Sequence, residues 1–125
     1  MINKLAVTTI WVRDLNEALR FYTEKLGFTV ATDQPMADDK GTRWIELSLP
    51  GGGVTVSIFP PQDPNTKVGG FSNIIFTCED VRQTYEELKE RGVQFIQEPK
   101  DEFWGTFCIF ADPDDNQFVL SSTPT

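Results

Sequence analysis

The sequence predicts an α+β fold made of two tandem βαβββ modules within one domain of 125 residues. Two observations predict it. A strand–helix–strand pattern occurs twice, and each copy continues into two further apolar runs separated by turn-forming residues. The length is that of a single ordinary domain with one sizeable core. We expect module one over about residues 1–60, a linker over about 61–70 and module two over about 71–125.

Each module opens with an apolar strand that ends at an aspartate, where a helix can begin. The first strand runs from Val7 to Asp14, and the second runs from Asn73 to Asp80. An aspartate in this position caps a helix, because its carboxylate accepts the unpaired N–H groups of the first turn. The two aspartates therefore predict where both helices start.

Apolar residues then recur at spacings of three and four, which is the pattern of an amphipathic helix. The stripe residues are Leu15, Ala18, Leu19, Tyr22 and Leu26 in the first module and Val81, Tyr85 and Leu88 in the second. Gly27 and Gly92 follow the stripes, and glycine adopts the left-handed conformation of a helix end at little cost. Alternating strands are expected next, over residues 28–32 and 93–97.

Two further strands complete each module. They are expected over 43–49 and 54–59 in the first module, and over 107–110 and 117–121 in the second. Their connecting loops are rich in Gly, Pro, Asp and Asn, the residues that tight turns require. The loop over 112–116 is rich in aspartate, but it lacks the Gly and Glu that a calcium-binding loop needs, so we interpret it as a hairpin turn.

Charge and hydropathy exclude several classes of partner. Eleven Lys and Arg against 19 Asp and Glu give a formal net charge of −8, which repels nucleic acid and anionic lipid. The same charge suits a cationic or neutral small molecule, although it also serves solubility. No run approaches the ~20 apolar residues of a membrane span. The first residues lack the features of a signal peptide, so we expect a cytoplasmic protein.

The sequence contains no histidine, which removes His-based nucleophile activation, a His general base and His-ligated metals. Cys78 and Cys108 lie in apolar runs and are interpreted as small core residues. Glu46 is the one weak candidate for a catalytic base, since burial in an apolar strand would raise its pKa. The alternative is an acid that faces solvent or forms a salt bridge. Tyr22 and Tyr85 belong to the helical stripes and are expected to pack.

Two motifs lie near the ends of this duplicated pattern. They are Asp14-Leu15…Ala18…Phe21-Tyr22…Leu26-Gly27-Phe28 and Gly105-Thr106…Phe110…Asp112-Pro113-Asp114…Asn116. With the repeat, they resemble the vicinal oxygen chelate superfamily, the group that contains glyoxalases, extradiol dioxygenases and bleomycin-resistance proteins. The resemblance implies a mixed sheet of eight strands that curls around a cleft with the helices outside. It also implies a homodimer, because many small members complete the cleft with two chains, and uncovered strand edges favour the same arrangement.

Metalloenzymes that are similar place their ligands at four strand positions. The resemblance maps these positions to Val7, Ser57, Asn73 and Val119. A divalent ion takes carboxylate, imidazole or amide oxygen ligands, and of these four residues only Asn73 supplies one. Glu46 lies in an Ile-Glu-Leu run that resembles the strand carrying a metal ligand in glyoxalases. This run is in the third strand of the module, however, and comparison of the two modules assigns the metal-ligand position to Ser57. We therefore predict no metal and no other cofactor, and we do not expect metal-dependent glyoxalase or dioxygenase activity.

Residues two apart on a strand share a face, so the residues two positions from the mapped ligand positions should also line the cleft. The resulting lining is apolar and aromatic, with a few neutral polar groups. Trp44 and Trp104 could close over a planar ligand by stacking or by a cation–π contact. The alternative for both is that they cover the core or a dimer interface, and Trp11 is either core or cleft floor. The predicted ligand-binding residues are Val7, Thr9, Trp11, Arg43, Trp44, Ser57, Phe59, Asn73, Ile75, Phe103, Trp104, Val119 and Ser121.

The function that the sequence favours is non-catalytic binding of a small molecule in a dimer cleft, without metal. The ligand is expected to be apolar or aromatic, and the acidic chain also suits a cationic one. The alternative is a lyase, isomerase or dioxygenase-type enzyme of the same superfamily with an unknown small substrate. A regulatory interaction module is the third hypothesis. The sequence identifies neither the ligand nor the way in which the modules of two chains would pair.

Overall fold

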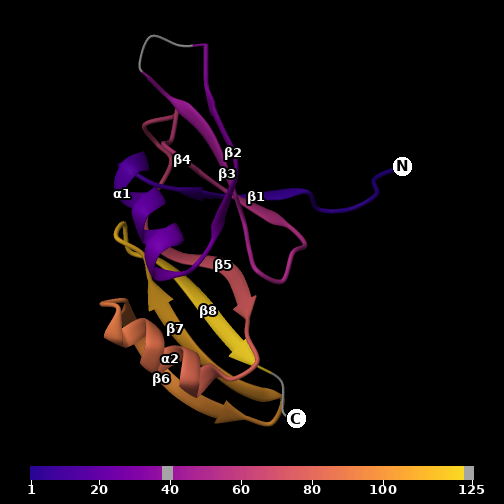
Figure 1. Cartoon of the computed structure of the whole chain (residues 1–125), viewed down its shortest axis with the longest axis vertical. Coiled ribbons are helices and arrows are strands. Elements are labelled where there is room, and N and C mark those ends of the chain that lie inside the picture. Colours follow the sequence, from indigo (N-terminus) through magenta and orange to yellow (C-terminus); the bar gives the residue numbers. More distant parts are fainter. Residues whose placement is uncertain (38–40, 123–125) are drawn as a thin grey trace. The chain divides into compact units, whose positions relative to one another are not determined.

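The structure is a computed structural model that describes residues 1–37 and 41–122. Its elements in chain order are β1 (Val7–Trp11), α1 (Leu15–Arg20), η1 (Phe21–Lys25), β2 (Thr29–Pro35), β3 (Arg43–Ser48), β4 (Thr55–Phe59), β5 (Gly70–Thr77), α2 (Val81–Glu90), β6 (Gln94–Glu102), β7 (Gly105–Ala111) and β8 (Asn116–Ser122) (Figure 1). This order confirms the α+β fold of two tandem βαβββ modules. The end of the second predicted module, residues 123–125, lies outside the described residues.

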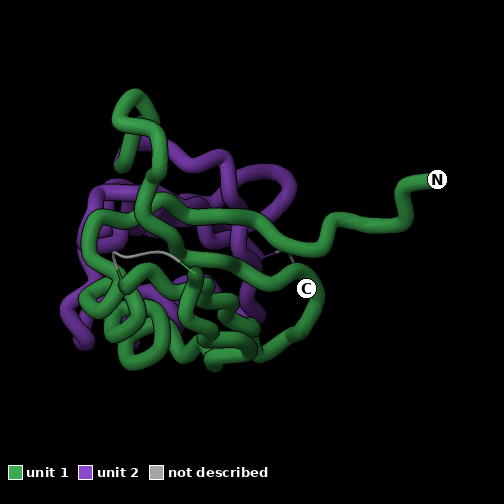
Figure 2. Tube along the Cα trace, turned by 90° about the horizontal axis from the view of Figure 1, so that it is seen from above, with its two compact units in different colours: residues 1–68 green, residues 69–125 purple. Residues whose placement is uncertain are grey.

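The chain divides into two compact units, Met1–Val68 and Gly69–Thr125, here called unit 1 and unit 2 (Figure 2). Each unit holds one four-stranded mixed sheet. The strand order is β1-β4-β3-β2 in unit 1 and β5-β8-β7-β6 in unit 2, so the two sheets share one topology. In both, the first strand lies at an edge and pairs in parallel with the last strand of its unit.

Both helices begin at the predicted aspartates. The Asp14 carboxylate accepts a hydrogen bond from the Glu17 backbone N–H at 3.0 Å, and the Asp80 carboxylate accepts one from the Gln83 backbone N–H at 3.1 Å. Gly27, with a φ of 78°, follows the first helical segment, as expected for a residue that ends a helix.

The first helical segment differs from the prediction in its geometry. The sequence predicts one α-helical stripe, whereas the α-helix ends at Arg20 and continues as a π-helical turn, η1. The wider turn allows the consecutive residues Phe21 and Tyr22 both to be buried, with ring centroids 5.1 Å apart. An α-helical pattern cannot indicate this, because consecutive residues on an ideal α-helix point about 100° apart.

The core of each unit lies between the helix and one face of the sheet. In unit 1 it contains Ile10, Ile45, Leu47, Val56 and Ile58 from the strands and Val12 just after β1, with Ala18, Phe21 and Tyr22. In unit 2 it contains Cys108, Phe110, Phe118 and Leu120 from the strands, with Val81, Tyr85 and Leu88. Because strand residues alternate, the residues between these face the other side. We call that other side the open face of each sheet.

Burial raises the pKa of the Cys108 thiol to about 12, with a smaller contribution from Cys78. Cys108 is fully buried, as predicted, whereas Cys78 is half-buried, and both are free thiols. No helix within residues 1–37 and 41–122 is long and apolar enough to cross a membrane.

Candidate functional site

A row of polar side chains crosses the open face of the unit 1 sheet. Thr9 lies opposite Ser57, Ser57 lies opposite Glu46, and Glu46 lies opposite Thr32, so the row spans all four strands. The hydroxyl oxygens of Thr9 and Ser57 are 2.8 Å apart and share a hydrogen bond. Ser57 is fully buried, and this bond satisfies its hydroxyl group within the sheet.

Aromatic side chains lie beside this polar row. Trp11 is opposite Phe59 in the β1–β4 register, and the rings of Trp44 and Phe59 have centroids 5.6 Å apart. Trp11 is 37% exposed and Trp44 is half-buried, so parts of both indoles are accessible. This open face therefore combines ring surfaces with hydroxyl groups and one carboxylate, as small-molecule sites commonly do.

Glu46 is held by two neutral donors. The Trp44 Nε1–H donates to Glu46 Oε2 at 2.8 Å, and the Thr55 hydroxyl donates to Glu46 Oε1 at 2.8 Å. These hydrogen bonds, that from Trp44 first, lower the pKa of Glu46 despite the opposing effect of burial. The sequence-based expectation of a raised pKa is wrong, because both donors stabilise the charged form. An ionised carboxylate of lowered pKa is a weak base, so Glu46 is a poor general base.

Arg43 lies on the other side of this sheet. Its guanidinium donates to the Asp33 carboxylate at 2.8 and 3.0 Å and to the Asn16 side-chain oxygen of α1 at 3.0 Å. Alternation along β3 therefore separates Arg43 from its neighbour Trp44. The predicted site residues that share the unit 1 open face are Val7, Thr9, Trp11, Trp44, Ser57 and Phe59.

The open face of unit 2 carries an apolar row beside a row of mixed polarity. Ile75 lies opposite Val119, and Val119 lies opposite Ile109, which gives a row of three aliphatic side chains. In the next row Ser121 lies between Thr77 and Phe107. Ile75 is 66% exposed, whereas Val119 and Ile109 are half-buried, so the β5 end of this row is accessible.

The β6–β7 turn carries the other two predicted residues of unit 2. Trp104 stacks on Phe107 with a centroid separation of 5.8 Å, and Phe103 is 96% exposed. Trp104 therefore lies against the open face, through Phe107, whereas Phe103 projects from the turn.

Asn73 lies in a β-bulge and has a φ of 64°, in the left-handed region. The register shifts by two residues here, since Phe71 pairs with Gln117 but Ile75 pairs with Val119. The Ser72 hydroxyl donates to the Gln117 carbonyl oxygen at 2.6 Å and accepts from the Ile74 N–H at 3.1 Å. The bulge therefore takes Asn73 out of the regular pairing on which the sequence mapping relied.

The residues at the four mapped ligand positions do not fit a divalent metal ion. Val7 and Val119 have no donor atom, and the Ser57 hydroxyl is already bonded to Thr9. Asn73, on its bulge, is the one good ligand type among the four. Within residues 1–37 and 41–122, no group of three or more His, Cys, Asp or Glu side chains could hold a metal ion.

Thr55 and Thr32 are not among the residues predicted from the sequence, although Thr55 donates to Glu46 and Thr32 lies opposite it. Period-2 alternation along β4 places Thr55 on the face of Ser57 and Phe59, so the signal was present in the sequence. Thr32 could not be found in this way, because a register shift between Val30 and Thr32 interrupts the alternation of β2.

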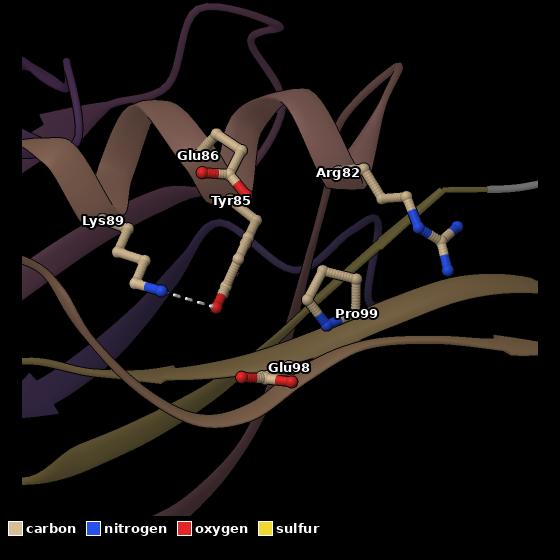
Figure 3. Close-up of a pocket in the computed structure, with 6 residues that line it drawn as sticks. All are labelled: Arg82, Tyr85, Glu86, Lys89, Glu98 and Pro99. Carbon is tan, nitrogen blue, oxygen red and sulfur yellow. Dashed lines mark hydrogen bonds between the residues drawn. The ribbon is translucent and has the colours of Figure 1, made fainter.

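A shallow surface pocket lies elsewhere, between α2 and β6 (Figure 3). The Lys89 ammonium donates to the Tyr85 hydroxyl at 3.4 Å, and Glu86 and Glu98 also line the pocket. This hydrogen bond raises the pKa of Lys89. Charges of both signs line this pocket, and none of the predicted ligand-binding residues is among them.

Comparison with known proteins identifies one family. Residues 4–120 match the model of the Glyoxalase/Bleomycin resistance protein/Dioxygenase superfamily. The uncharacterised protein YetH of Bacillus subtilis is 37% identical over 120 residues, which cover 96% of this chain and 98% of YetH. A crystal structure of a superfamily member from Sphaerobacter thermophilus has 32% sequence identity to this chain and a TM-score of 0.86. The match covers 97% of this chain and 98% of the Sphaerobacter chain. TnmS3, an antibiotic binding protein from Streptomyces sp. CB03234, has 28% identity and a TM-score of 0.87, with 98% of both chains covered.

Proposed function

The chain belongs to the glyoxalase/bleomycin resistance protein/dioxygenase superfamily, and we propose that it binds an apolar, aromatic small molecule without a metal and releases it unchanged. Superfamily membership supports small-molecule binding in general. The observation that carries the finer proposal is the unit 1 open face, where the aromatic residues lie beside hydroxyl groups and an ionised carboxylate. Such surfaces suit a planar organic molecule better than a metal ion.

The similarity to TnmS3 supports binding rather than catalysis. That protein is an antibiotic binding protein, and it resembles this chain over 98% of both lengths. The alternative, a lyase, isomerase or dioxygenase-type enzyme, has less support. The ligand positions of similar metalloenzymes carry a poor donor set here, and the lowered pKa of Glu46 makes it a weak base.

We further propose that two copies of the chain form a homodimer that covers the open face of unit 2. Ile75 and Phe71 are more than half exposed on β5, and Phe103 is almost fully exposed on the β6–β7 turn. Ile75 extends the aliphatic row of Val119 and Ile109, and exposed apolar surface of this kind is typical of interaction sites. A homodimer would bury it, and it would also complete a cleft of the kind that the resemblance implies.

Tryptophan fluorescence tests the proposed function. EDTA-dialysed protein is titrated with a panel of planar heteroaromatic compounds that includes acridine and 9-aminoacridine, and each compound is then recovered for mass spectrometry. We expect saturable quenching by at least one compound, at about one equivalent per subunit, and recovery of that compound with its mass unchanged. The absence of saturable quenching across the panel, or a changed mass after incubation, would contradict the proposal.

A further inference from the structure

We propose that Glu46 makes the unit 1 open face selective for planar ligands that carry a positive charge, such as a protonated heteroaromatic amine. This inference rests on the proposed function and deepens it by naming the ligand class and the residue that determines the selectivity. It has two observations behind it: the neutral partners of the carboxylate and the aromatic rings beside it.

The Glu46 carboxylate keeps its charge and part of its bonding capacity. Its two partners, the Trp44 indole N–H and the Thr55 hydroxyl, are neutral, so neither cancels the negative charge. A carboxylate has about four lone-pair positions, and these two bonds use one on each oxygen. The other positions can accept hydrogen bonds from a ligand. The side chain is half-buried, so part of it can be reached from solvent.

The two bonds also fix the carboxylate in place. Each oxygen is held at 2.8 Å from a donor on its own sheet, one on β3 and one on β4. A side chain that is already ordered loses little conformational entropy when a ligand binds, and this favours affinity. Glu46 is therefore a preorganised acceptor and differs from a mobile surface glutamate.

The neighbouring rings favour the same class of ligand. Trp44 donates to Glu46 through its ring edge, which leaves the indole faces for contact with Phe59 and with a ligand. The negative face of an indole attracts a cation, and a planar cation also stacks on it. A carboxylate beside aromatic rings combines charge pairing with stacking, so an anion is repelled and a neutral ring gains the stacking alone.

The Thr9–Ser57 hydroxyl pair, in which Ser57 is fully buried and Thr9 is half-buried, contributes no charge to this face. Both hydroxyl groups are engaged with each other at 2.8 Å and carry no charge. Glu46 is the only charged residue among the described residues that we place on this open face. Its removal should therefore abolish the selectivity while the stacking surface remains.

A matched pair of probes tests the inference. Acridine and 9-aminoacridine share one three-ring system, and at about pH 8 the first is neutral whereas the second is a cation. We expect the wild-type protein, dialysed against EDTA, to bind 9-aminoacridine about tenfold more tightly than acridine in isothermal titration calorimetry. The Glu46→Gln variant preserves the shape and removes the charge, so it should bind both probes with similar affinity.

Two further variants control for net charge and for folding. Glu86→Gln removes an equal charge from the exposed surface of α2 and should keep the tenfold preference. Glu46→Asp retains a carboxylate and should restore part of the preference, and thermal melts establish that each variant is folded. Equal affinity of the wild type for the two probes, or equal weakening by Glu46→Gln and Glu86→Gln, overturns the inference but leaves the proposed function intact. If neither probe binds the wild type, the inference fails, and the proposed function then depends on the other compounds of the panel.

Discussion

At the scale of single residues, the electrostatics of the unit 1 open face depend on Glu46 and its two neutral donors. The folded protein holds the pKa of Glu46 below the ordinary value of 4.5, chiefly through the Trp44 hydrogen bond and then through that of Thr55. The charged form is therefore favoured by folding. Its contribution to stability is fully present above pH 4.5, and it is lost as the pH falls through the lowered pKa.

The first prediction concerns this pH dependence. Glu46→Gln should lower the free energy of unfolding at about pH 7, and the difference from the wild type should shrink as the pH is lowered to about 3. Urea denaturation at a series of pH values measures both proteins. Thr55→Val is the companion variant, because it removes one donor and should reduce the pH-dependent difference without abolishing it. A difference that stays constant across the series would contradict this account of the carboxylate.

Gly69 gives the second prediction, because its backbone and its surroundings both require glycine. Its φ is 93°, and a Cβ atom there would lie 2.8 Å from the Asp114 backbone oxygen. Gly69→Ala should therefore lower the free energy of unfolding by roughly 2 kcal/mol or more. Gly51→Ala is the control, since no atom lies within 4 Å of its Cβ position and no left-handed φ is involved. Similar urea midpoints for the two variants would show that the close approach at Gly69 is not maintained in solution.

At the scale of elements, each helix depends on a cap that the sequence identifies. Asp80 precedes α2, and its carboxylate accepts the Gln83 backbone N–H. We predict that Asp80→Ala lowers the free energy of unfolding by about 1 kcal/mol. Asp80→Asn keeps an oxygen acceptor in the same place and should lower the free energy of unfolding much less. Urea denaturation distinguishes the two, and equal losses for Ala and Asn would indicate that the charge matters and the capping bond does not.

The helices and strands could be predicted because local chemistry sets their limits. Asp14 and Asp80 cap the helices, glycines follow them, and apolar residues alternate along the strands that were expected. The departures occur where the regular period is broken. The π-helical turn at Phe21–Lys25 adds a residue to one turn, and the bulge at Asn73 adds residues to one strand. Both changes satisfy packing that a local pattern does not encode.

The candidate site could be predicted in part for the same reason. Thr9, Ser57 and Phe59 were placed on one face by alternation, and the register of β1 and β4 brings Thr9 and Ser57 together. Arg43 was predicted to line the cleft together with Trp44, although alternation sends neighbouring strand residues to opposite faces. The bonds from Trp44 and Thr55 to one carboxylate depend on side-chain geometry, which strand patterns cannot provide.

At the scale of the whole molecule, the two units share one topology but differ in the chemistry of their open faces. Unit 1 presents Glu46 with hydroxyl groups and aromatic rings, and unit 2 presents an aliphatic row with Phe107 and Trp104. The repeat therefore preserves the core-facing pattern, while the open faces have diverged. We propose that the first open face determines ligand selectivity and that the second mediates subunit association.

The assignment of association leads to a prediction about oligomeric state. Ile75→Glu introduces a charge into the apolar row and should shift the protein from dimer to monomer in analytical ultracentrifugation, because an uncompensated charge in an apolar interface is costly. Gln83→Glu adds the same charge to the exposed surface of α2 and should leave the dimer unchanged. A monomeric wild type, or a dimer that persists in Ile75→Glu, would refute the proposed role of this face.

The most direct test of the central claim, binding of an aromatic ligand without a metal, is one calorimetric comparison. 9-Aminoacridine is titrated into EDTA-dialysed protein, and the titration is repeated after addition of Mn²⁺ or Ni²⁺. We expect the same dissociation constant and about one ligand per subunit in all cases, because Val7, Ser57 and Val119 are not effective metal ligands. Binding that occurs only in the metal-loaded protein would contradict the claim and would favour a metal-dependent enzyme.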